Sequence, residues 1–341
     1  MTIKEIWSIE QHDQRVFNIL EKWQRGLDLG KKVKRAPFGE NSTESEHKTE
    51  ALIRKFCKKV DNQNANVGLT SSDMEENERT MAIEETLGYL HGRINNELIP
   101  LVRTAFTGMD ADRVVMGYTH LMKARPIKAK HRADYHVYQF TVIEPPRIIY
   151  RGIKGSTGDG KYCDSVCHTN NVNASLFKAQ IETTASQTST HVTDIEFAVW
   201  LASITAAMMK TAGSLRMLIS MGKIRTTNND VGSTAMAHKA PNPWRFEKVC
   251  GMGGLVLSLP QVAFRAVADC WLERTLTDQS VLRYEMERMS VLVDDLITLM
   301  VDGIKRIEVI EDASDEIDKE GQFLNAILAG SPRLEARELI K

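Results

Sequence analysis

The longest apolar segment of the chain limits the possible folds most strongly. Residues 192–221 read VTDIEFAVWLASITAAMMKTAGSLRMLISM, in which few charged side chains interrupt the apolar ones. A helix that is apolar on nearly every side has to be buried. Because burying a helix of this length requires several other long helices around it, the segment predicts a helical bundle.

Other segments supply those helices. Residues 73–106 place apolar side chains three and four positions apart, as at Ile83, Leu87 and Leu90, which predicts an unusually long amphipathic helix. Further helical patterns cover residues 126–143, which two prolines end, residues 243–272, which three glycines interrupt, and residues 277–307. Since strand signals are almost absent, we predict an all-α fold.

Shorter helical patterns flank the central bundle and lie near residues 15–23 and 311–330. A chain of 341 residues is long enough for more than one domain. We predict an N-terminal helical domain of residues 1–65, a central long-helix bundle domain of residues 66–305 and a short C-terminal helical domain of residues 306–341.

The charge of the chain is almost balanced. Lysine and arginine number 44, aspartate and glutamate 45, and the net charge is −1. Such a chain has no overall field that would draw it to nucleic acid or to an anionic membrane. Its start lacks the pattern of a signal peptide, and no stretch approaches the roughly twenty apolar residues of a membrane span. Five cysteines without framework spacing favour a reducing compartment, so we predict a cytoplasmic protein.

Two local patterns imitate known sites. Residues 155–162, GSTGDGKY, nearly fit a phosphate-binding loop, but Tyr162 stands where that loop needs a small hydroxyl residue to hold magnesium. Cys163 and Cys167, with the histidine that follows them, do not have the spacing of a common zinc site. We therefore predict neither a phosphate-binding loop nor a metal site at these residues.

Polar segments rich in hydroxyl residues and glycine lie where the predicted helices begin or end. They cover residues 67–73, 117–126, 154–160, 187–196, 232–247 and 271–283. The start of a helix offers free backbone N–H groups and a favourable dipole to carboxylates and phosphates. Each segment taken alone is an ordinary helix cap. Taken together they predict a polyanionic substrate.

Three of these segments resemble the aspartase/fumarase superfamily of lyases. GSTAMAHKAPNP, residues 232–243, resembles the signature loop of that superfamily. GYTHLMKARP, residues 117–126, is similar to its Gly-x-Thr-His segment, and KGSTGDG, residues 154–160, to its Lys-Gly-Thr-Thr-Gly segment. The remaining three segments, residues 67–73, 187–196 and 271–283, look most like those of the adenylosuccinate lyases.

The resemblance implies elimination of fumarate from a succinylated purine nucleotide. Adenylosuccinate would give AMP, and SAICAR would give AICAR. Ser233 on the flexible signature loop would be the base and His120 the general acid, because a histidine side chain ordinarily titrates near neutral pH. Lys239 would stabilise the carbanion, and the loop would close over the substrate to desolvate the serine. Such a reaction would need no metal and no organic cofactor, because the leaving group departs by proton transfer and charge stabilisation alone.

The resemblance also implies a set of substrate-binding residues. They are His47, Thr70, Ser71, Thr119, Ser156, Thr157, Gln187, Asn242, Arg245, Arg274, Ser280 and Arg283. The hydroxyl residues at 70–71 and 156–157 would hold the succinyl carboxylates or neighbouring groups. Arg274, Ser280 and Arg283 would bind the nucleotide phosphate, for which the planar fork of arginine is well suited.

Some positions depart from the family pattern. Ala237 replaces a proline of the signature loop, one extra residue separates Lys239 from Asn242, and Asn66 stands in place of a histidine. Three interpretations therefore remain open. The chain is a lyase of succinylated purine nucleotides, a lyase of the same superfamily with a different succinylated substrate, or a catalytically silent structural homologue.

The resemblance finally implies an assembly. In the superfamily, long helices from four chains form one helical core, and each active site takes its segments from three chains. The apolar helix predicted at residues 192–221 fits burial in such an interface as well as in the core of a single chain. We therefore predict a homotetramer with shared active sites.

Overall fold

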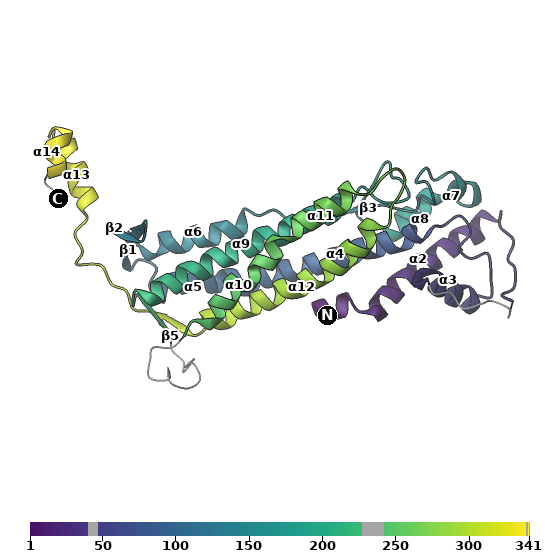
Figure 1. Ribbon diagram of the computed structural model, residues 1–341, viewed down its shortest axis with the longest axis horizontal. Helices are drawn as coiled ribbons and strands as arrows, with labels where there is room; N and C mark the ends of the chain where they lie inside the picture. Colours follow the sequence, from purple (N-terminus) through teal and green to yellow (C-terminus); the bar gives the residue numbers. More distant parts are fainter. Residues whose placement is uncertain (40–46, 227–241, 339, 341) are drawn as a thin grey trace. The chain divides into compact units, whose positions relative to one another are not determined.

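A computed structural model of the protein describes residues 1–39, 47–226, 242–338 and 340. Its elements are mainly helices, so the predicted all-α class is confirmed (Figure 1). The chain forms two compact units. Unit 1 consists of Met1–Gly92, Glu144–Ser203 and Gly254–Asp294, and unit 2 of Arg93–Ile143, Ile204–Gly253 and Asp295–Lys341. These units divide the chain at other places than the three predicted domains, which stay a prediction.

Unit 1 contains the N-terminal helices, which form a small apolar core. Its elements are α1 (Ile3–Ile6), α2 (Ile9–Gly30), α3 (Lys48–Lys59), α4 (Ser71–Arg93), β3 (Ile149–Tyr150), α7 (Lys161–Val166), α8 (Thr169–Leu176), β4 (Gln180–Ile181), the first part of α9 (Val192–Ser220), α11 (Leu259–Ala268) and most of α12 (Thr277–Ile304). The apolar side chains of α2 recur every three or four positions and are buried, as at Val16, Leu20 and Trp23. Trp23 is fully buried, and its Nε1 donates to the carbonyl oxygen of Val67 at 3.0 Å, so burial leaves the polar atom of the ring with a partner.

Unit 2 contains the other halves of the long helices and a hairpin. Its elements are η1 (Ile94–Leu98), α5 (Ile99–Thr107), β1 (Val114–Thr119), β2 (Met122–Lys128), α6 (Ala129–Thr141), the end of α9, β5 (Ile224–Thr226), α10 (Trp244–Leu257) up to Gly253, the end of α12, β6 (Ile307–Val309), α13 (Lys319–Leu328) and α14 (Arg333–Glu338). β1 pairs with β2 and β5 with β6, both antiparallel.

The long helix predicted at residues 73–106 is present but is not uniform. It consists of α4, one π-helical turn in η1, and α5. Pro100 lies in the first turn of α5. Because proline has no N–H and its ring crowds the carbonyl four positions before it, a regular α-helical ladder cannot continue through that position. A single π turn directly before it is one of the known ways in which a helix absorbs such a defect.

The helix predicted to begin at Pro126 is wrong at its start. The chain forms the hairpin β1–β2 there, and α6 begins only at Ala129. The register shifts between Met116 and Tyr118, where a side chain on Gly117 would lie 2.9 Å from the carbonyl oxygen of Arg125. Sequence reasoning missed the hairpin because its turn is made by His120 and Leu121, both with positive φ, rather than by the usual Asn-Gly pair.

The glycines of the 243–272 pattern do not interrupt a helix. α10 runs through all three, and the break lies at Ser258, one residue before α11 begins with Pro260 in its first turn. Gly253 explains why a glycine stands inside α10. A side chain there would lie 2.6 Å from the sulfur of Met209 on α9, so the glycine leaves room for that methionine between the two helices.

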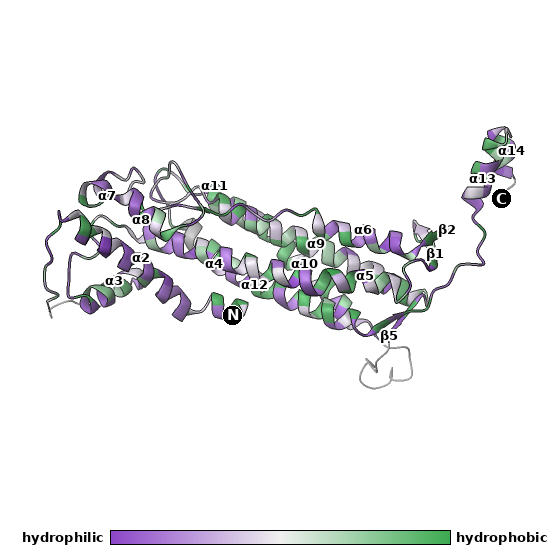
Figure 2. Cartoon of the chain, turned by 180° about the vertical axis from the view of Figure 1, so that it is seen from behind, coloured by the Kyte–Doolittle hydropathy of each residue, from purple (hydrophilic) through white to green (hydrophobic). Residues whose placement is uncertain are grey.

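Two segments meet the length and apolarity that a membrane span needs, so the statement that no stretch approaches that length was wrong. They are Val192–Ser220 and Trp244–Ala268, of which 56% and 33% of the most apolar window is buried, respectively. Figure 2 shows the apolar residues along them. Because the core helix of a soluble protein passes the same test, burial of more than half of the first window fits the bundle helix predicted from the sequence.

One buried histidine of unit 2 makes stability depend on pH. His136 on α6 stacks on Phe106 with ring centroids 4.3 Å apart, and its Nδ1 lies 3.1 Å from the hydroxyl of Thr211. Burial, together with the charges of Lys210 and Arg132, lowers the pKa of His136 to about 4. The side chain is therefore neutral at pH 7 in the folded protein.

We expect unit 2 to lose stability below pH 6.5. Between an unfolded pKa of 6.5 and a folded pKa of about 4, the unfolded chain binds a proton that the folded chain does not. The free energy of unfolding should therefore fall by about 2 kcal/mol from pH 7 to pH 5 through this group. His136→Asn, which keeps a polar atom near Thr211, should reduce that loss when urea unfolding is measured at both pH values. An equal loss in the variant would contradict this assignment.

Candidate functional site

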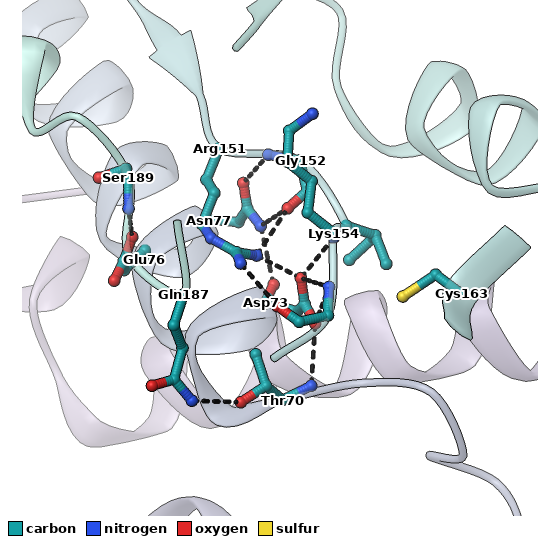
Figure 3. A network of polar contacts seen from close by, with 12 residues as sticks. Thr70, Asp73, Glu76, Asn77, Arg151, Gly152, Lys154, Cys163, Gln187 and Ser189 are labelled. Carbon is teal, nitrogen blue, oxygen red and sulfur yellow. Dashed lines mark hydrogen bonds and ion pairs between the residues drawn. The ribbon is translucent and has the colours of Figure 1, made fainter. Parts of the chain in front are cut away.

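Four residues with predicted binding roles meet at the start of α4 in unit 1. Nε2 of Gln187 donates to the hydroxyl oxygen of Thr70 at 3.2 Å, as Figure 3 shows. Nη1 of Arg274 donates to the hydroxyl oxygen of Ser71 at 3.4 Å. The paired residues are 117 and 203 positions apart in the chain. All four side chains are half-buried, which suits a site that is open to a ligand on one side.

A single carboxylate joins this helix start to the loop of residues 154–160. Asp73 is fully buried and accepts hydrogen bonds from the backbone N–H of Thr70 at 2.9 Å, of Lys154 at 2.7 Å and of Gly155 at 3.1 Å (Figure 3). Because these donors belong to two separate segments, the carboxylate holds the segments together.

Arg151 is the charged partner of that carboxylate. It is 1% exposed, and its Nη1 forms an ion pair with Asp73. Its Nη2 donates to the carbonyl oxygens of Gly155 at 2.8 Å and Ser186 at 2.9 Å. The guanidinium group therefore connects α4, the loop of residues 154–160 and the residue that precedes Gln187.

The loop itself lies directly against the segment that carries Gln187. A side chain on Gly158, whose φ is +79°, would lie 2.2 Å from the carbonyl oxygens of Ala185 and Ser186, so no other residue fits there. The two predicted hydroxyl residues of this loop, Ser156 and Thr157, are exposed. The hydroxyl of Thr157 donates to Asp159 at 3.2 Å, and both side chains face outward from a loop whose backbone is fixed.

A second buried charge network anchors the far end of this segment. Nε of Arg79 donates to Asp194 at 2.8 Å, and Nδ1 of His191 lies 3.1 Å from the other oxygen of the same carboxylate. Burial by itself would raise the pKa of Asp194, but Arg79 and His191 outweigh it and hold that pKa well below its usual range. The backbone N–H of Ser189 donates to the carboxylate of Glu76 on α4. The segment from Gln187 to α9 is therefore fixed to α4 at several points.

The cysteines that imitate a metal site are buried in unit 1. Burial raises the pKa of Cys163 to about 12 and that of Cys167 to about 11. The thiol of Cys163 donates to the carbonyl oxygen of Gly68 at 3.0 Å. Both groups are therefore neutral thiols at pH 7. Within residues 1–39, 47–226, 242–338 and 340, the structure has no group of three or more His, Cys, Asp or Glu side chains that could hold a metal ion.

Several predicted residues lie in unit 2. Thr119 and His120 are exposed at the tip of the β1–β2 hairpin, and φ of His120 is +51°. Asn242 is exposed just before α10. Arg245 on α10 forms an ion pair with Asp302, and its guanidinium group lies 4.3 Å from the ring centre of Trp244.

The remaining predicted residues are more scattered. His47 caps the start of α3, where its Nδ1 accepts from the backbone N–H of Glu50 at 3.4 Å. Arg283 on α12 lines a cavity of about 440 Å³ in unit 1. Ser280 is also part of α12. Ser233 and Lys239 lie outside the residues that the structure describes.

Sequence reasoning missed the residues that hold this site together. They are Asp73, Arg79, Arg151, Asp194 and also Asn77, whose side chain exchanges two hydrogen bonds with the backbone of Gly152, and all of them are buried. The sequence gives one indication of a structural role for Asp73, because an acidic residue in the first turn is typical of a helix start. The buried arginines had none, since an arginine in a helix or loop is ordinarily exposed.

Comparisons with known proteins agree with the fold and the motifs. Residues 14–258 match the protein family described as Lyase. The chain is 25% identical over 252 residues to the adenylosuccinate lyase of Saccharomyces cerevisiae, a match that covers 69% of this chain and 52% of the yeast protein. It is 22% identical over 381 residues to the adenylosuccinate lyase of Archaeoglobus fulgidus, covering 99% and 83% of the two chains.

Solved structures show the same fold. The 3-carboxy-cis,cis-muconate lactonizing enzyme from Pseudomonas putida matches 99% of this chain and 83% of its own, with a TM-score of 0.76 and 17% identity. The fumarate lyase from Mesorhizobium sp. BNC1 matches 99% and 84%, with a TM-score of 0.73 and 15% identity. The chain spans about half the length of the yeast relative, 52%.

Proposed function

The chain belongs to the lyase family, and on that premise we propose that it eliminates fumarate from a succinylated purine nucleotide. One observation carries this proposal. Residues of three distant segments that the adenylosuccinate lyase pattern assigns to substrate meet at the start of α4, through the contacts of Gln187 with Thr70 and of Arg274 with Ser71. A helix start with hydroxyl, amide and guanidinium donors suits a substrate that carries carboxylates and a phosphate.

The proposed reaction needs a base, an acid and a cation. Ser233 removes a proton from the carbon beside a succinyl carboxylate, and Lys239 stabilises the negative charge that develops there. The carbon–nitrogen bond then breaks, and His120 protonates the departing nitrogen. The products are fumarate and AMP or AICAR. No step in this scheme calls for a metal or an organic cofactor.

We also infer the assembly and location that the family pattern implies. The protein would be a cytoplasmic homotetramer in which each active site combines segments of three chains. Light scattering on the purified protein measures this directly. A mass of four chains is expected, and a monomer of 38.4 kDa would contradict the shared site.

A different succinylated substrate is the second candidate, and the position of His47 favours it. The side chain of His47 caps α3, so its Nδ1 already accepts a hydrogen bond from the backbone of this chain. In contrast, Lys123 and Arg125, which add positive charge next to His120, form ion pairs with Glu316 and Glu320. This added charge is thus largely compensated and gives no separate support for a different substrate.

Fumarate release tests the proposed function. The purified protein is incubated in turn with adenylosuccinate, SAICAR and a succinylated amine that carries no nucleotide, and fumarate is followed by absorbance and by proton NMR. Turnover of the two nucleotides supports the proposal. Turnover of the third compound alone would support the second candidate, and no turnover of any of them would identify a catalytically silent homologue.

A further inference from the structure

We propose that the ion pair between Asp73 and Arg151 is a positioning pair that sets the affinity of the site for a dicarboxylate. It does so by fixing the spacing between the hydroxyl pair Thr70–Ser71 and the hydroxyl pair Ser156–Thr157. The link to catalysis rests on the proposed function, but the positioning itself is a property of these contacts. Neither residue belongs to the set of binding residues that the family resemblance implies.

The first argument is the number of hydrogen bonds that converge on the carboxylate. Oδ1 of Asp73 accepts from the N–H of Lys154 at 2.7 Å and also from Arg151. Oδ2 accepts from the N–H of Thr70 at 2.9 Å and of Gly155 at 3.1 Å. All of these donors are satisfied inside the protein, so they are not offered to a ligand. Anion binding at this place therefore depends on where the neighbouring hydroxyl groups stand.

The second argument is that this carboxylate has no equivalent replacement. Both carboxylate oxygens of Asp73 accept hydrogen bonds from N–H donors. An asparagine at this position would replace one of these oxygens by an NH₂ group, which cannot accept a hydrogen bond. That NH₂ group would lie against a backbone N–H that it cannot bind, so one of the two segments would lose its hydrogen bond to residue 73. The hydroxyl pair of that segment would then move relative to the other pair, although no residue that touches the ligand has changed.

The third argument concerns the burial and the hydrogen bonds of Arg151. It is 1% exposed, and besides Asp73 it donates to the carbonyl oxygens of Gly155 and Ser186. A lysine at this position would keep the charge, but its single ammonium group lacks the planar fork that reaches three acceptors in fixed directions. Arg151→Lys should therefore loosen the loop without removing the ion pair.

The experiment compares Asp73→Asn and Arg151→Lys with a matched control, Arg15→Lys. Arg15 on α2 is also a buried arginine, with Glu78 at 2.9 Å and the carbonyl oxygen of Ile6 at 2.7 Å as partners. Three quantities are measured for each protein: KM and kcat with adenylosuccinate, the dissociation constant of fumarate by calorimetry, and the urea midpoint of unfolding.

We expect KM and the fumarate dissociation constant to rise about tenfold or more in the two test variants, because small displacements of binding groups have large effects. kcat should change less. The control should lose stability with KM and fumarate binding within about twofold of wild type. Unchanged KM and fumarate binding in folded test variants, or an equal rise in the control, would overturn the proposal.

Two further outcomes are separable. If the wild type binds fumarate but does not turn over a succinylated nucleotide, the proposed function fails, and the fumarate constants of the variants still decide the role of the pair. If the wild type neither binds fumarate nor turns over a substrate, both fail. Should a single variant not fold, the double variant Asp73→Asn with Arg151→Met replaces it, because removing both charges of a buried pair is better tolerated than removing only one.

Discussion

Alanine in place of His120 is expected to lower kcat for fumarate release about 10³-fold, with a much smaller change in KM. A positioned general acid contributes about 10²–10⁴-fold to a rate. A water molecule that took the place of the imidazole would not be fixed in the position from which the proton is donated. The hairpin tip that carries His120 is exposed, so the substitution removes a reactive group without opening a core. Steady-state kinetics with adenylosuccinate measure both constants.

The same loss is expected for Ser233→Ala, which removes the proposed base. Because an acid and a base act on one reaction, the two substitutions together should cost much less than the product of their separate effects. His168→Ala is a suitable control, since His168 is an exposed histidine at the start of α8. If Ser233→Ala left the rate intact, the assignment of the base would be wrong. If His120→Ala left the rate intact, the assignment of the general acid would be wrong.

Methionine in place of Arg79 is expected to lower the free energy of unfolding by about 3–5 kcal/mol. Arg79 and Asp194 are each 4% exposed, so the substitution leaves a carboxylate buried without its guanidinium partner. Urea unfolding followed by circular dichroism at pH 7 measures the change. The double variant Arg79→Met with Asp194→Leu should recover a large part of the loss, because the buried charge is then gone as well.

The pH dependence provides a check on the cause. The folded pKa of Asp194 lies below its ordinary value of 3.8, so the group stabilises the fold above that value and the stability is lost as pH falls through the folded pKa. Without Arg79 this acid-induced loss should be smaller. A variant that loses stability equally at pH 7 and pH 3 would show that packing, and not charge, accounts for the effect of Arg79.

The long helices could be predicted from the sequence because their signal is local. The patterns at residues 192–221 and 277–307 correspond to α9 and α12 within a few residues. The hairpin β1–β2 escaped prediction because its pairing is decided by contacts between strands, such as Val114 with Lys128. Similarly, the three glycines that sequence rules treat as helix interruptions stand inside α10, and one of them, Gly253, lies against Met209 of α9.

The candidate site divides along the same line. The motifs that identify the lyase family, and the hydroxyl, histidine and arginine residues within them, can be read from the sequence alone because each motif is a short continuous segment. Tertiary structure decided which of these segments meet and what holds them. Asp73 and Arg151 are 78 positions apart, and Arg79 and Asp194 are 115 apart. A charged residue becomes a buried structural partner only when a distant segment removes it from water and supplies the opposite charge, and nothing in its own neighbourhood along the chain records that event.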